Sequence, residues 1–265
     1  MSTVIIIPAR YASSRYPGKP LAMLHQPTGE TMSLIEMSYK TACQVKGVDN
    51  VFVATDDLRI KEAAEAFGAS VIMTSDTCKN GTERCAEALA VAELEANLII
   101  NLQGDAPLTP PWFVEELIAA LNTDQSAEMA TPVLQVDAET YSHFRQDRLN
   151  NRVGGTTAIF DRHRYALYFS KEVLPFLDIS KLHDPQNIPV YHHVGVYAYR
   201  PDALKTYMSL PEGPLEQLEG LEQLRFLENG HKVKCVEVDA KGRIFWELNN
   251  PEDVERIENA MRSMA

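Results

Sequence analysis

Short apolar runs alternate with amphipathic stretches through the first half of the chain. The apolar runs are rich in β-branched residues and too short for helices, which is typical of strands buried in a sheet. They occupy 4–8, 51–55, 70–74, 98–103 and 129–135. Apolar residues recur with helical spacing in the stretches between them, at 34–45, 58–67, 82–95 and 112–121, the last opened by Thr109 or Pro110. This alternation predicts an α/β fold with a mostly parallel, mixed sheet flanked by helices.

The second half is less regular. Its pattern predicts strands at 156–160, 165–169 and 190–199, a helix at 215–228, a strand pair at 233–238 and 244–248, and a closing helix at 251–261. A polar connection fills 178–189, and Asn229–Gly230 is a good helix C-cap. Because no repeat or low-complexity linker interrupts the chain, we expect one domain over 1–265, with halves at 1–135 and 136–265.

Polar segments follow three predicted strands directly. They are the Pro-Ala-Arg that begins at Pro8, Thr55–Asp57 and Gln103–Asp105. Ligands of parallel sheets bind at the carboxyl ends of the strands. We therefore expect these three segments to meet along one edge.

The first polar segment concentrates positive charge in an acidic protein. The chain has a formal net charge of −12, yet Arg10, Arg15 and Lys19 lie close together in PARYASSRYPGKPL at 8–21. Gly18 allows close backbone approach, and the serines and cations are donors that suit phosphate oxygens. The segment fits neither the GxxxxGK[ST] frame nor GxGxxG. A phosphate-binding loop is the favoured interpretation, and a surface loop with solvated cations is the alternative.

Composition narrows the class of protein further. An acidic chain without clustered positive charge elsewhere argues against a nucleic-acid partner. The four cysteines show no metal-binding spacing, so we expect reduced thiols rather than disulfides. The first apolar run is too short for a signal peptide, and no stretch approaches the length of a membrane span. These features predict a soluble, cytoplasmic protein without a membrane partner.

The segment at 8–21 resembles the signature PARxxSxRxPGKPL of the cytidylyltransferases that activate acidic sugars. Further motifs follow in the order of that family: ATDD at 54–57, NGTER at 80–84, NLQGDAP at 101–107, ALYFSK at 166–171, HHVGVYAYR at 192–200, LEQLEGLEQLRFLENG at 215–230 and NNPEDVERI at 249–257. Together they resemble the 3-deoxy-manno-octulosonate (Kdo) cytidylyltransferases, also called CMP-Kdo synthetases, of lipopolysaccharide assembly. The resemblance implies a Rossmann-like nucleotide-diphospho-sugar transferase fold.

The resemblance also implies a reaction and its residues. The anomeric hydroxyl of the sugar attacks the α-phosphorus of CTP, and pyrophosphate leaves. Lys19, Arg15 and Asp105 are the implied catalytic residues. The implied CTP-binding residues are Arg10, Ser13, Arg15, Lys19, Gly81, Thr82 and Arg84, of which Arg84 with Gly81 and Thr82 would recognise cytidine.

The family pattern assigns sugar binding and metal binding as well. The implied sugar-binding residues are Gln103, His193, Tyr197, Glu222 and Gln223, while Glu216 and Glu219 are expected to face solvent or to be structural. Mg²⁺ is the implied cofactor, held by Asp105 and, at the family's second metal position, by Asn249. The resemblance further implies a homodimer whose interface lies in the second half. Without the motif, a satisfied strand histidine is the favoured interpretation of His193.

Several residues depart from the family pattern. Asn249 stands where the family has a metal-binding Asp, and an uncharged amide is a weaker Mg²⁺ ligand, for which Glu247 is a candidate to compensate. Thr157, Lys171 and His192 stand at three basic positions of the family, which lowers the positive charge near the predicted sugar site or replaces a bidentate group. A sugar that carries its own ammonium group needs less protein cation. We therefore expect 8-amino-3,8-dideoxy-manno-octulosonate as the preferred substrate.

Three other functions stay open at this stage. Kdo itself is the first alternative substrate. A nucleotide or sugar sensor without turnover is a second interpretation, which Asn249 alone supports. A cytidylyltransferase for sialic acid or a related nonulosonate ranks low, because the EQLR helix and the NNPED ending fit the Kdo branch better.

Overall fold

The structure, a computed structural model, describes residues 2–13, 16–178, 180, 182, 184, 187–243, 248 and 250–264. The chain forms two compact units, and each is discontinuous in sequence. Unit 1 comprises Met1–Ile118, Val196–Met208 and Ala240–Ala265, whereas unit 2 comprises Ala119–Gly195 and Ser209–Asp239. The halves expected at 1–135 and 136–265 therefore do not coincide with the units, because two later segments return to the first.

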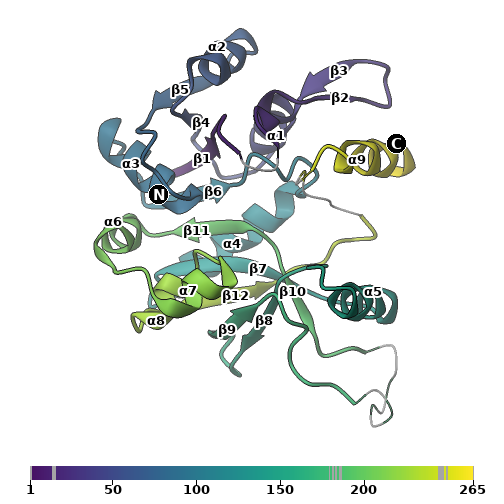
Figure 1. The fold of residues 1–265 in the computed structure, drawn as a ribbon. Helices are drawn as coiled ribbons and strands as arrows, with labels where there is room; N and C mark the ends of the chain where they lie inside the picture. Colours follow the sequence, from purple (N-terminus) through teal and green to yellow (C-terminus); the bar gives the residue numbers. More distant parts are fainter. Residues whose placement is uncertain are drawn as a thin grey trace. The chain divides into compact units, whose positions relative to one another are not determined.

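Unit 1 is built on a sheet with the strand order β5-β4-β1-β6-β11 (Figure 1). The strands are β1 (Thr3–Ala9), β4 (Asn50–Thr55), β5 (Ser70–Met73), β6 (Leu98–Leu102) and β11 (Val196–Tyr199). Neighbouring strands from β5 to β6 are parallel, and β11 is antiparallel to β6. The mostly parallel sheet predicted from the alternating pattern is confirmed in this unit.

The helices of unit 1 cover both faces of this sheet. They are α1 (Leu34–Ala42), α2 (Leu58–Ala66), α3 (Gly81–Val91), the start of α4 (Pro111–Thr123), α6 (Pro201–Ser209) and α9 (Asp253–Met264). A side chain at Gly104 would contact Ile7 and Ile35 of α1, whereas one at Gly81 of α3 would contact Asn101. Asn101 is in register with Ile6, the neighbour of Ile7 in β1. Since neighbouring strand residues face opposite ways, α1 and α3 lie on opposite faces.

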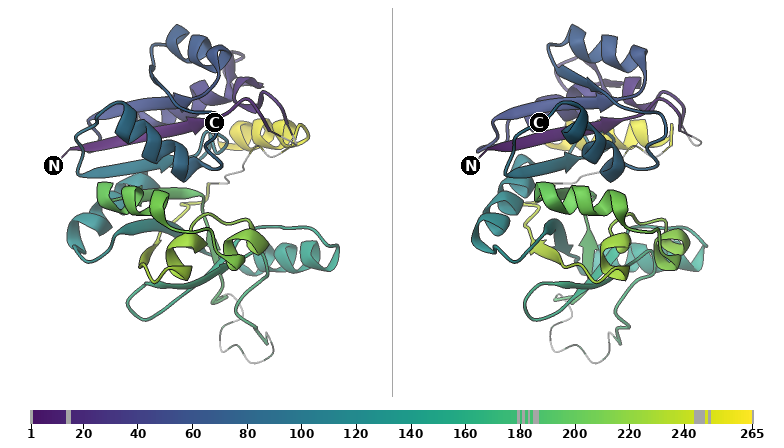
Figure 2. Two further views of the ribbon diagram at one scale, coloured as in Figure 1. Left: turned by 60° about the vertical axis from the view of Figure 1, so that its left-hand side comes forward. Right: turned by 90° about the vertical axis from the view of Figure 1, so that its left-hand side faces the viewer.

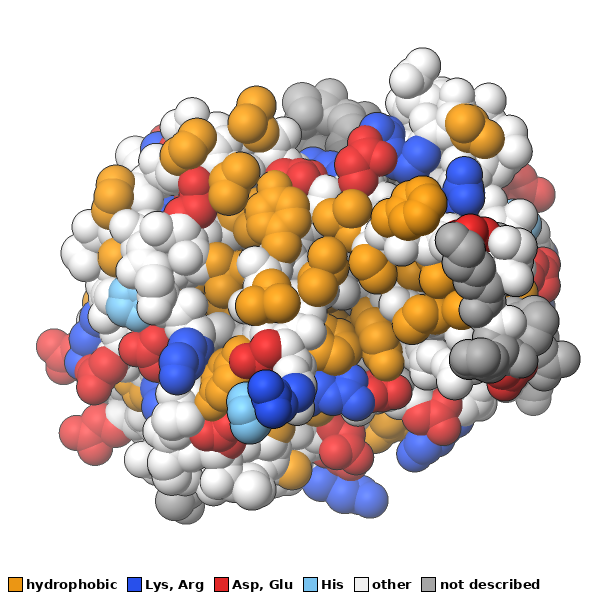
Figure 3. Space-filling model, turned by 90° about the horizontal axis from the view of Figure 1, so that it is seen from below, with side chains coloured by type: hydrophobic (Ala, Val, Ile, Leu, Met, Phe, Trp, Pro, Cys, Tyr) orange, Lys and Arg blue, Asp and Glu red, His pale blue; other side chains and the backbone are white. Residues whose placement is uncertain are grey.

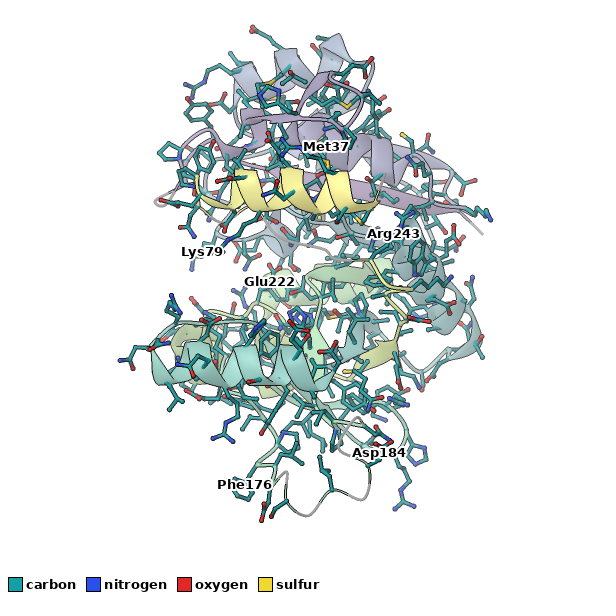
Figure 4. The ribbon with its side chains drawn as sticks, turned by 90° about the vertical axis from the view of Figure 1, so that its right-hand side faces the viewer. Met37, Lys79, Phe176, Asp184, Glu222 and Arg243 are labelled. Atoms are coloured by element: carbon teal, nitrogen blue, oxygen red, sulfur yellow. The ribbon has the colours of Figure 1, made fainter. Side chains whose placement is uncertain are left out.

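The C-terminal helix returns to the N-terminal part of unit 1. Helix α9 lies beside the hairpin of β2 (Met23–His25) and β3 (Thr31–Ser33), as Figures 1 and 2 show. Met37 lies next to α9 in Figure 4, within a buried apolar cluster of Leu24, Leu34, Met37, Leu248, Ile257 and Met261. Glu258 of α9 accepts a hydrogen bond of 2.8 Å from the backbone N–H of His25.

In the mixed sheet of unit 2, β7 (Met129–Gln135) pairs with β12 (Val233–Glu237) and β10 (Tyr191–His193). The strand β12 is parallel to β7, and β10 is antiparallel to it. The sheet continues from β10 through β8 (Thr157–Phe160) to β9 (Ala166–Ser170), all antiparallel. The helices of this unit are the end of α4, α5 (Ala138–Leu149), α7 (Pro214–Glu219) and α8 (Leu224–Glu228).

Two predictions for the second half were wrong in detail. The expected strand at 190–199 is two strands, because β10 ends at His193 and β11 begins at Val196. The N–H of Val194 still donates to Pro132 of β7 at 3.1 Å, but Pro132 has no N–H with which to continue the ladder. The expected helix at 215–228 is two short helices, because Gly220 adopts a left-handed conformation with φ of 60° and ends α7. For the expected strand at 244–248, only Leu248 lies among the described residues.

The state of the cysteines and the apolar character of the helices were both predicted from the sequence. The four cysteines are free thiols, as expected. Within the described part of the chain, no helix combines the length and apolar character needed to cross a bilayer.

Candidate active site

The three polar segments that follow β1, β4 and β6 meet at one edge of the unit 1 sheet, as predicted. These strands are adjacent and parallel, so their carboxyl ends lie side by side. The contact that joins two of the segments is an ion pair of 2.5 Å between Lys19 Nζ and Asp105 Oδ2. Both side chains are partly buried, with 15% and 28% of their surface exposed. The pair therefore interacts more strongly than one in bulk water.

The N-terminal loop, residues 10–19, is folded back on itself before Lys19. Gly18 has a φ of 70° and donates a backbone hydrogen bond of 2.9 Å to the carbonyl of Tyr11. Ser13 Oγ accepts from the N–H of Tyr16 at 3.3 Å, and Arg10 donates to the carbonyl of Lys79 at 3.4 Å. Ser14 and Arg15 lie outside the described residues, so the predicted role of Arg15 remains a prediction. The loop brings Lys19 of the predicted phosphate-binding set to Asp105.

Asp105 is also the point at which the C-terminal segment joins the site. The carbonyl of Asp105 accepts a hydrogen bond of 2.8 Å from the N–H of Leu248, which is fully buried. The predicted second metal position, Asn249, and its expected substitute Glu247 lie outside the residues that the structure describes. The sequence neighbour of Asn249 is thus fixed at Asp105, while the role of Asn249 stays a prediction.

The donor set at Asp105 fits one type of Mg²⁺ site. Among the described residues, no cluster of three or more His, Cys, Asp or Glu could hold a metal ion. An all-protein metal cage is therefore not formed by that part of the chain. Mg²⁺ in nucleotide-binding proteins is commonly held by one or two carboxylates together with substrate phosphates and water. Asp105, partly exposed and beside a cation that can pair with phosphate instead, fits such a site.

Arg84, predicted to recognise cytidine, is held by protein groups in unit 1. Its Nη2 lies 3.2 Å from Asp56 Oδ1, and its Nη1 donates to Thr74 Oγ1 at 2.6 Å. The Arg84 side chain is only 3% exposed. A buried guanidinium in an ion pair is well suited to fix the start of α3 and the segment before it. Its predicted contact with cytidine stays a prediction.

The start of α3 lies directly against β6. Asn80 caps the helix by accepting from the N–H of Glu83 at 2.8 Å, and Thr82 Oγ1 lies 2.8 Å from the hydroxyl of Tyr199 in β11. A Cβ at Gly81 would lie 2.7 Å from Gln103 Nε2 and 3.3 Å from Asn101 Nδ2. A larger residue at this position would therefore require the ends of these two amide side chains to shift. The structure brings the predicted residues Gly81 and Gln103 into contact.

Asn101 is an unusual residue of this region. It is fully buried, and neither polar atom of its side chain has a hydrogen-bond partner among the described residues. Asn101 is in register with Tyr197 of β11, and like Gln103 it packs on Gly81. A buried amide without partners costs roughly 1–3 kcal/mol relative to a satisfied or apolar group. No pattern along the chain predicts this cost.

Replacing Asn101 by leucine is expected to stabilise the protein. Leucine has nearly the shape of asparagine and removes both unpaired atoms, so the free energy of unfolding should rise by about 1–2 kcal/mol. Urea denaturation of the Asn101→Leu and wild-type proteins measures the change. Asn101→Asp is the matched control and should destabilise, because it places a charge at the same buried position. A less stable Asn101→Leu protein would mean that the amide is satisfied in solution.

The predicted sugar-binding residues are divided between the units. Gln103 and Tyr197 belong to unit 1, whereas His193, Glu222 and Gln223 belong to unit 2. Tyr197 is buried in β11, and Glu222 and Gln223 form the turn between α7 and α8. Each unit thus carries part of the predicted sugar-binding set.

The two strand histidines of unit 2 are neutral at ordinary pH. His193 Nε2 lies 2.9 Å from Thr131 Oγ1, and its ring packs edge-on against Phe169. Burial, with a smaller contribution from the charge of His192, lowers the pKa of His193 to about 3. Burial likewise lowers the pKa of His192 to about 4. Neither imidazole supplies a positive charge for an anionic ligand.

Two acidic residues of the 215–230 motif, Glu216 and Glu219, were expected either to face solvent or to be structural, and their contacts are structural. Glu216 and Arg225 form a buried bidentate pair with both N–O distances at 2.7 Å. Glu219 accepts hydrogen bonds from Ser170 Oγ at 2.6 Å and from the N–H of Lys171 at 2.9 Å. These contacts fix the two helices on either side of Glu222 and Gln223.

The three departures from basic residues have different surroundings. Thr157 is buried and donates from Oγ1 to the carbonyl of Glu172 at 2.7 Å. Lys171 Nζ lies 3.2 Å from the position of a Cβ on Gly220, close to the turn that carries Glu222. With His192 uncharged, Lys171 is the one of these three positions that retains a positive charge.

Comparison with known proteins agrees with this geometry. A family model described as Cytidylyltransferase matches residues 4–234. The 3-deoxy-manno-octulosonate cytidylyltransferase of Maricaulis maris (strain MCS10) is 44% identical over 258 residues, which are 97% of this chain and 96% of that protein. The chain belongs to the 3-deoxy-manno-octulosonate cytidylyltransferase family. It is therefore a nucleotidyltransferase, as the motifs implied.

Other relatives differ in the sugar that their names specify. The 8-amino-3,8-dideoxy-manno-octulosonate cytidylyltransferase of Shewanella sp. (strain W3-18-1) is 40% identical over 262 residues, which are 98% of this chain and 99% of that protein. A solved CMP:2-keto-3-deoxy-manno-octonic acid synthetase complexed with CTP has a TM-score of 0.84 at 34% identity, with both chains fully covered. This similarity confirms the predicted fold class.

Two residues of the cytidylyltransferase site were missed from the sequence. Asp56 lies in the ATDD motif directly after β4, which marked the segment but not its pairing with Arg84. Asn101 lies in the NLQGDAP motif, where strand alternation with Gln103 was the available signal. The ion-pair partner of Asp56 and the residue that packs on Asn101 come from another element, so the pattern along the chain could mark only one side of each contact.

Proposed function

We propose that this chain transfers the cytidylyl group of CTP to a Kdo-type 3-deoxy-octulosonate and releases pyrophosphate. The observation that carries the proposal is the Lys19–Asp105 pair at the carboxyl edge of a parallel sheet. Lys19 belongs to the N-terminal loop, whose sequence holds further phosphate donors. The names of the relatives, among which one structure is complexed with CTP, support the choice of nucleotide and sugar.

In the proposed reaction the protein mainly positions and neutralises charge. The anomeric hydroxyl attacks the α-phosphorus and loses its proton to solvent, the bond between the α-phosphorus and the bridging oxygen breaks, and pyrophosphate leaves with the electron pair. Lys19, with Arg10, Ser13 and Arg15, would neutralise the triphosphate and the leaving pyrophosphate. Asp105 would hold Mg²⁺, with Asn249 as the second candidate ligand, and the ion when bound would add Lewis-acid stabilisation of phosphate charge.

We further propose that the preferred sugar is 8-amino-3,8-dideoxy-manno-octulosonate. Of the three positions that are basic in the family, Thr157 is uncharged, His192 is neutral and only Lys171 is charged. Glu219 accepts a hydrogen bond from the N–H of Lys171, and Lys171 Nζ lies close to Gly220, two residues before Glu222 in the chain. A sugar with an ammonium group suits such an environment better than one with only a carboxylate. The relatives include cytidylyltransferases named for Kdo and others named for the 8-amino sugar.

A competition assay tests both levels of the proposal. CTP, Mg²⁺ and an equal mixture of Kdo and the 8-amino sugar are incubated with the protein, and products are identified by mass spectrometry. We expect pyrophosphate and CMP-sugar in equal amounts, with the amino product in excess. A higher kcat/KM for Kdo would overturn the sugar preference alone. Binding of CTP without pyrophosphate release would instead favour the sensor that Asn249 suggested.

We propose that the protein is a homodimer that uses an apolar face of unit 2. Leu167 of β9 and Leu218 of α7 are exposed, and Phe176, which projects outward in Figure 4, is 91% exposed. Figure 3 views the molecule from below relative to Figure 1 and shows a broad group of apolar side chains on that face. Large exposed apolar patches are typical of interaction surfaces. Sedimentation equilibrium should give twice the chain mass, and a monomer at micromolar concentration would contradict this proposal.

A further inference from the structure

Tyr11, an unassigned position of the N-terminal loop, is in contact with two other parts of unit 1. The guanidinium carbon of Arg59 in α2 lies 3.3 Å from the centre of the Tyr11 ring. On the loop itself, a Cβ at Gly18 would lie 3.0–3.2 Å from the outer atoms of the same ring. The carbonyl of Tyr11 accepts the backbone hydrogen bond from Gly18. Tyr11 thus contacts the residue that immediately precedes Lys19 in two ways.

Arg59 is itself fixed by the motif that follows β4. Asp57 accepts from Arg59 Nε at 3.0 Å and from Arg59 Nη2 at 2.6 Å, and it caps α2 by accepting from the N–H of Arg59 at 2.9 Å. The hydrogen bonds from Arg59 hold the pKa of Asp57 below its usual value, so this carboxylate stays charged at neutral pH. A continuous series of contacts therefore runs from the end of β4 through Asp57, Arg59 and Tyr11 to Gly18.

The loop also has other contacts: Arg10 donates to the carbonyl of Lys79, Tyr16 packs against the buried apolar cluster, and Lys19 pairs with Asp105. The hydrogen bonds of Ser13 with Tyr16 and of Lys19 with Tyr16 are local to the loop. Gly18, with its φ of 70°, gives the loop conformational freedom that must be removed before the phosphate donors converge. A guanidinium stacked on an aromatic ring at short distance is a favourable contact that restricts the ring.

We infer that Tyr11 is a positioning residue for triphosphate binding, held in place by Arg59 and Asp57. The Tyr11 ring presets the turn at Gly18 and thereby the place of Lys19 beside Asp105, so that CTP meets a loop that is already ordered. The inference rests on the proposed function, because it concerns the loop that would bind the triphosphate. It assigns the second aspartate of the ATDD motif and Arg59 a part in nucleotide affinity without contact with nucleotide.

The test compares CTP binding and kinetics for variants of this series. Tyr11→Ala and Arg59→Ala should each raise the Kd and KM for CTP about tenfold, while the KM for sugar changes less than twofold. Tyr11→Phe keeps the ring and should retain wild-type affinity. The double variant should be no worse than Tyr11→Ala alone, since both substitutions break one series. Lys61→Ala, which removes another cation of α2 that pairs with Glu65, is the matched control and should have no effect.

Several results would overturn the inference. They are an unchanged Kd for CTP in Tyr11→Ala, a Tyr11→Phe protein as weak as Tyr11→Ala, or fully additive losses in the double variant. Additive losses would indicate that Arg59 contacts the triphosphate itself. Thermal unfolding of each variant distinguishes a folding defect from a specific loss of CTP affinity. A folding defect would weaken the binding of CTP and of sugar alike. A wild-type protein that does not bind CTP would overturn the proposed function instead, since calorimetry detects binding without turnover.

Discussion

Replacing Lys19 by glutamine is expected to lower kcat/KM for CTP by about a hundredfold to a thousandfold. Lys19 is partly buried, follows the constrained turn at Gly18 and lies 2.5 Å from Asp105. Removal of one preorganised group that stabilises developing charge typically costs about 3–4 kcal/mol, which corresponds to this loss. Glutamine keeps most of the length of the side chain and removes the charge. Pyrophosphate release at varied CTP concentration measures the effect.

Lys40→Gln is the matched control for this prediction. Lys40 also forms an ion pair, with Glu36 at 2.9 Å, but half of its side chain is exposed on the outside of α1. Exposed helical pairs of this kind contribute only about 0.3–0.5 kcal/mol. We expect Lys40→Gln to have wild-type kinetics. If Lys19→Gln also turned over normally, the N-terminal loop would not be the triphosphate site.

The largest effect on stability is expected for Glu216→Ala. Glu216 and Arg225 are each only 6% exposed and form two hydrogen bonds with one another. Loss of the carboxylate leaves a buried guanidinium without its partner, which typically costs about 3–5 kcal/mol. Denaturant unfolding of unit 2, followed by circular dichroism, should show this loss. Because Glu216 fixes the helix before Glu222 and Gln223, the KM for sugar should also rise.

Two further variants test the reason for this effect. Glu216→Leu combined with Arg225→Met replaces both charges by apolar groups and should recover most of the lost stability. Asp202→Ala removes a fully solvated partner of Lys205 and should change the free energy of unfolding by less than about 0.5 kcal/mol. Equal effects of Glu216→Ala and Asp202→Ala would show that burial of the pair is unimportant.

The sequence pattern was most informative where the sheet is parallel and buried on both faces. Each residue of β1 is buried, so its apolar run carries a clear signal. The position of the polar segments after β1, β4 and β6 then follows from strand direction alone. For this reason the sequence could predict that the segments after β1 and β6 meet, whereas the ion pair of Lys19 with Asp105 is seen only in the structure.

The pattern was less informative where tertiary contacts decide the local structure. Helix α5 was missed because only Tyr141 and Phe144 on it are buried hydrophobic residues, which leaves no apolar stripe. The break between β10 and β11 occurs opposite Pro132 of β7, which has no N–H to donate back to Val194, although the sequence around Val194 remains apolar. The surroundings of Arg84 and Asn101 depend likewise on residues from other elements, which no local pattern contains.

Calorimetric titration of CTP with and without Mg²⁺, for the wild-type protein and Asp105→Asn, tests the central claim most directly. We predict that Mg²⁺ strengthens CTP binding to the wild type at least tenfold and has no such effect on Asp105→Asn. Without Mg²⁺, the variant should bind CTP at least as well as the wild type, because Lys19 is released from its ion pair. The same Mg²⁺-dependent gain in both proteins would contradict an Asp105-held metal beside the triphosphate.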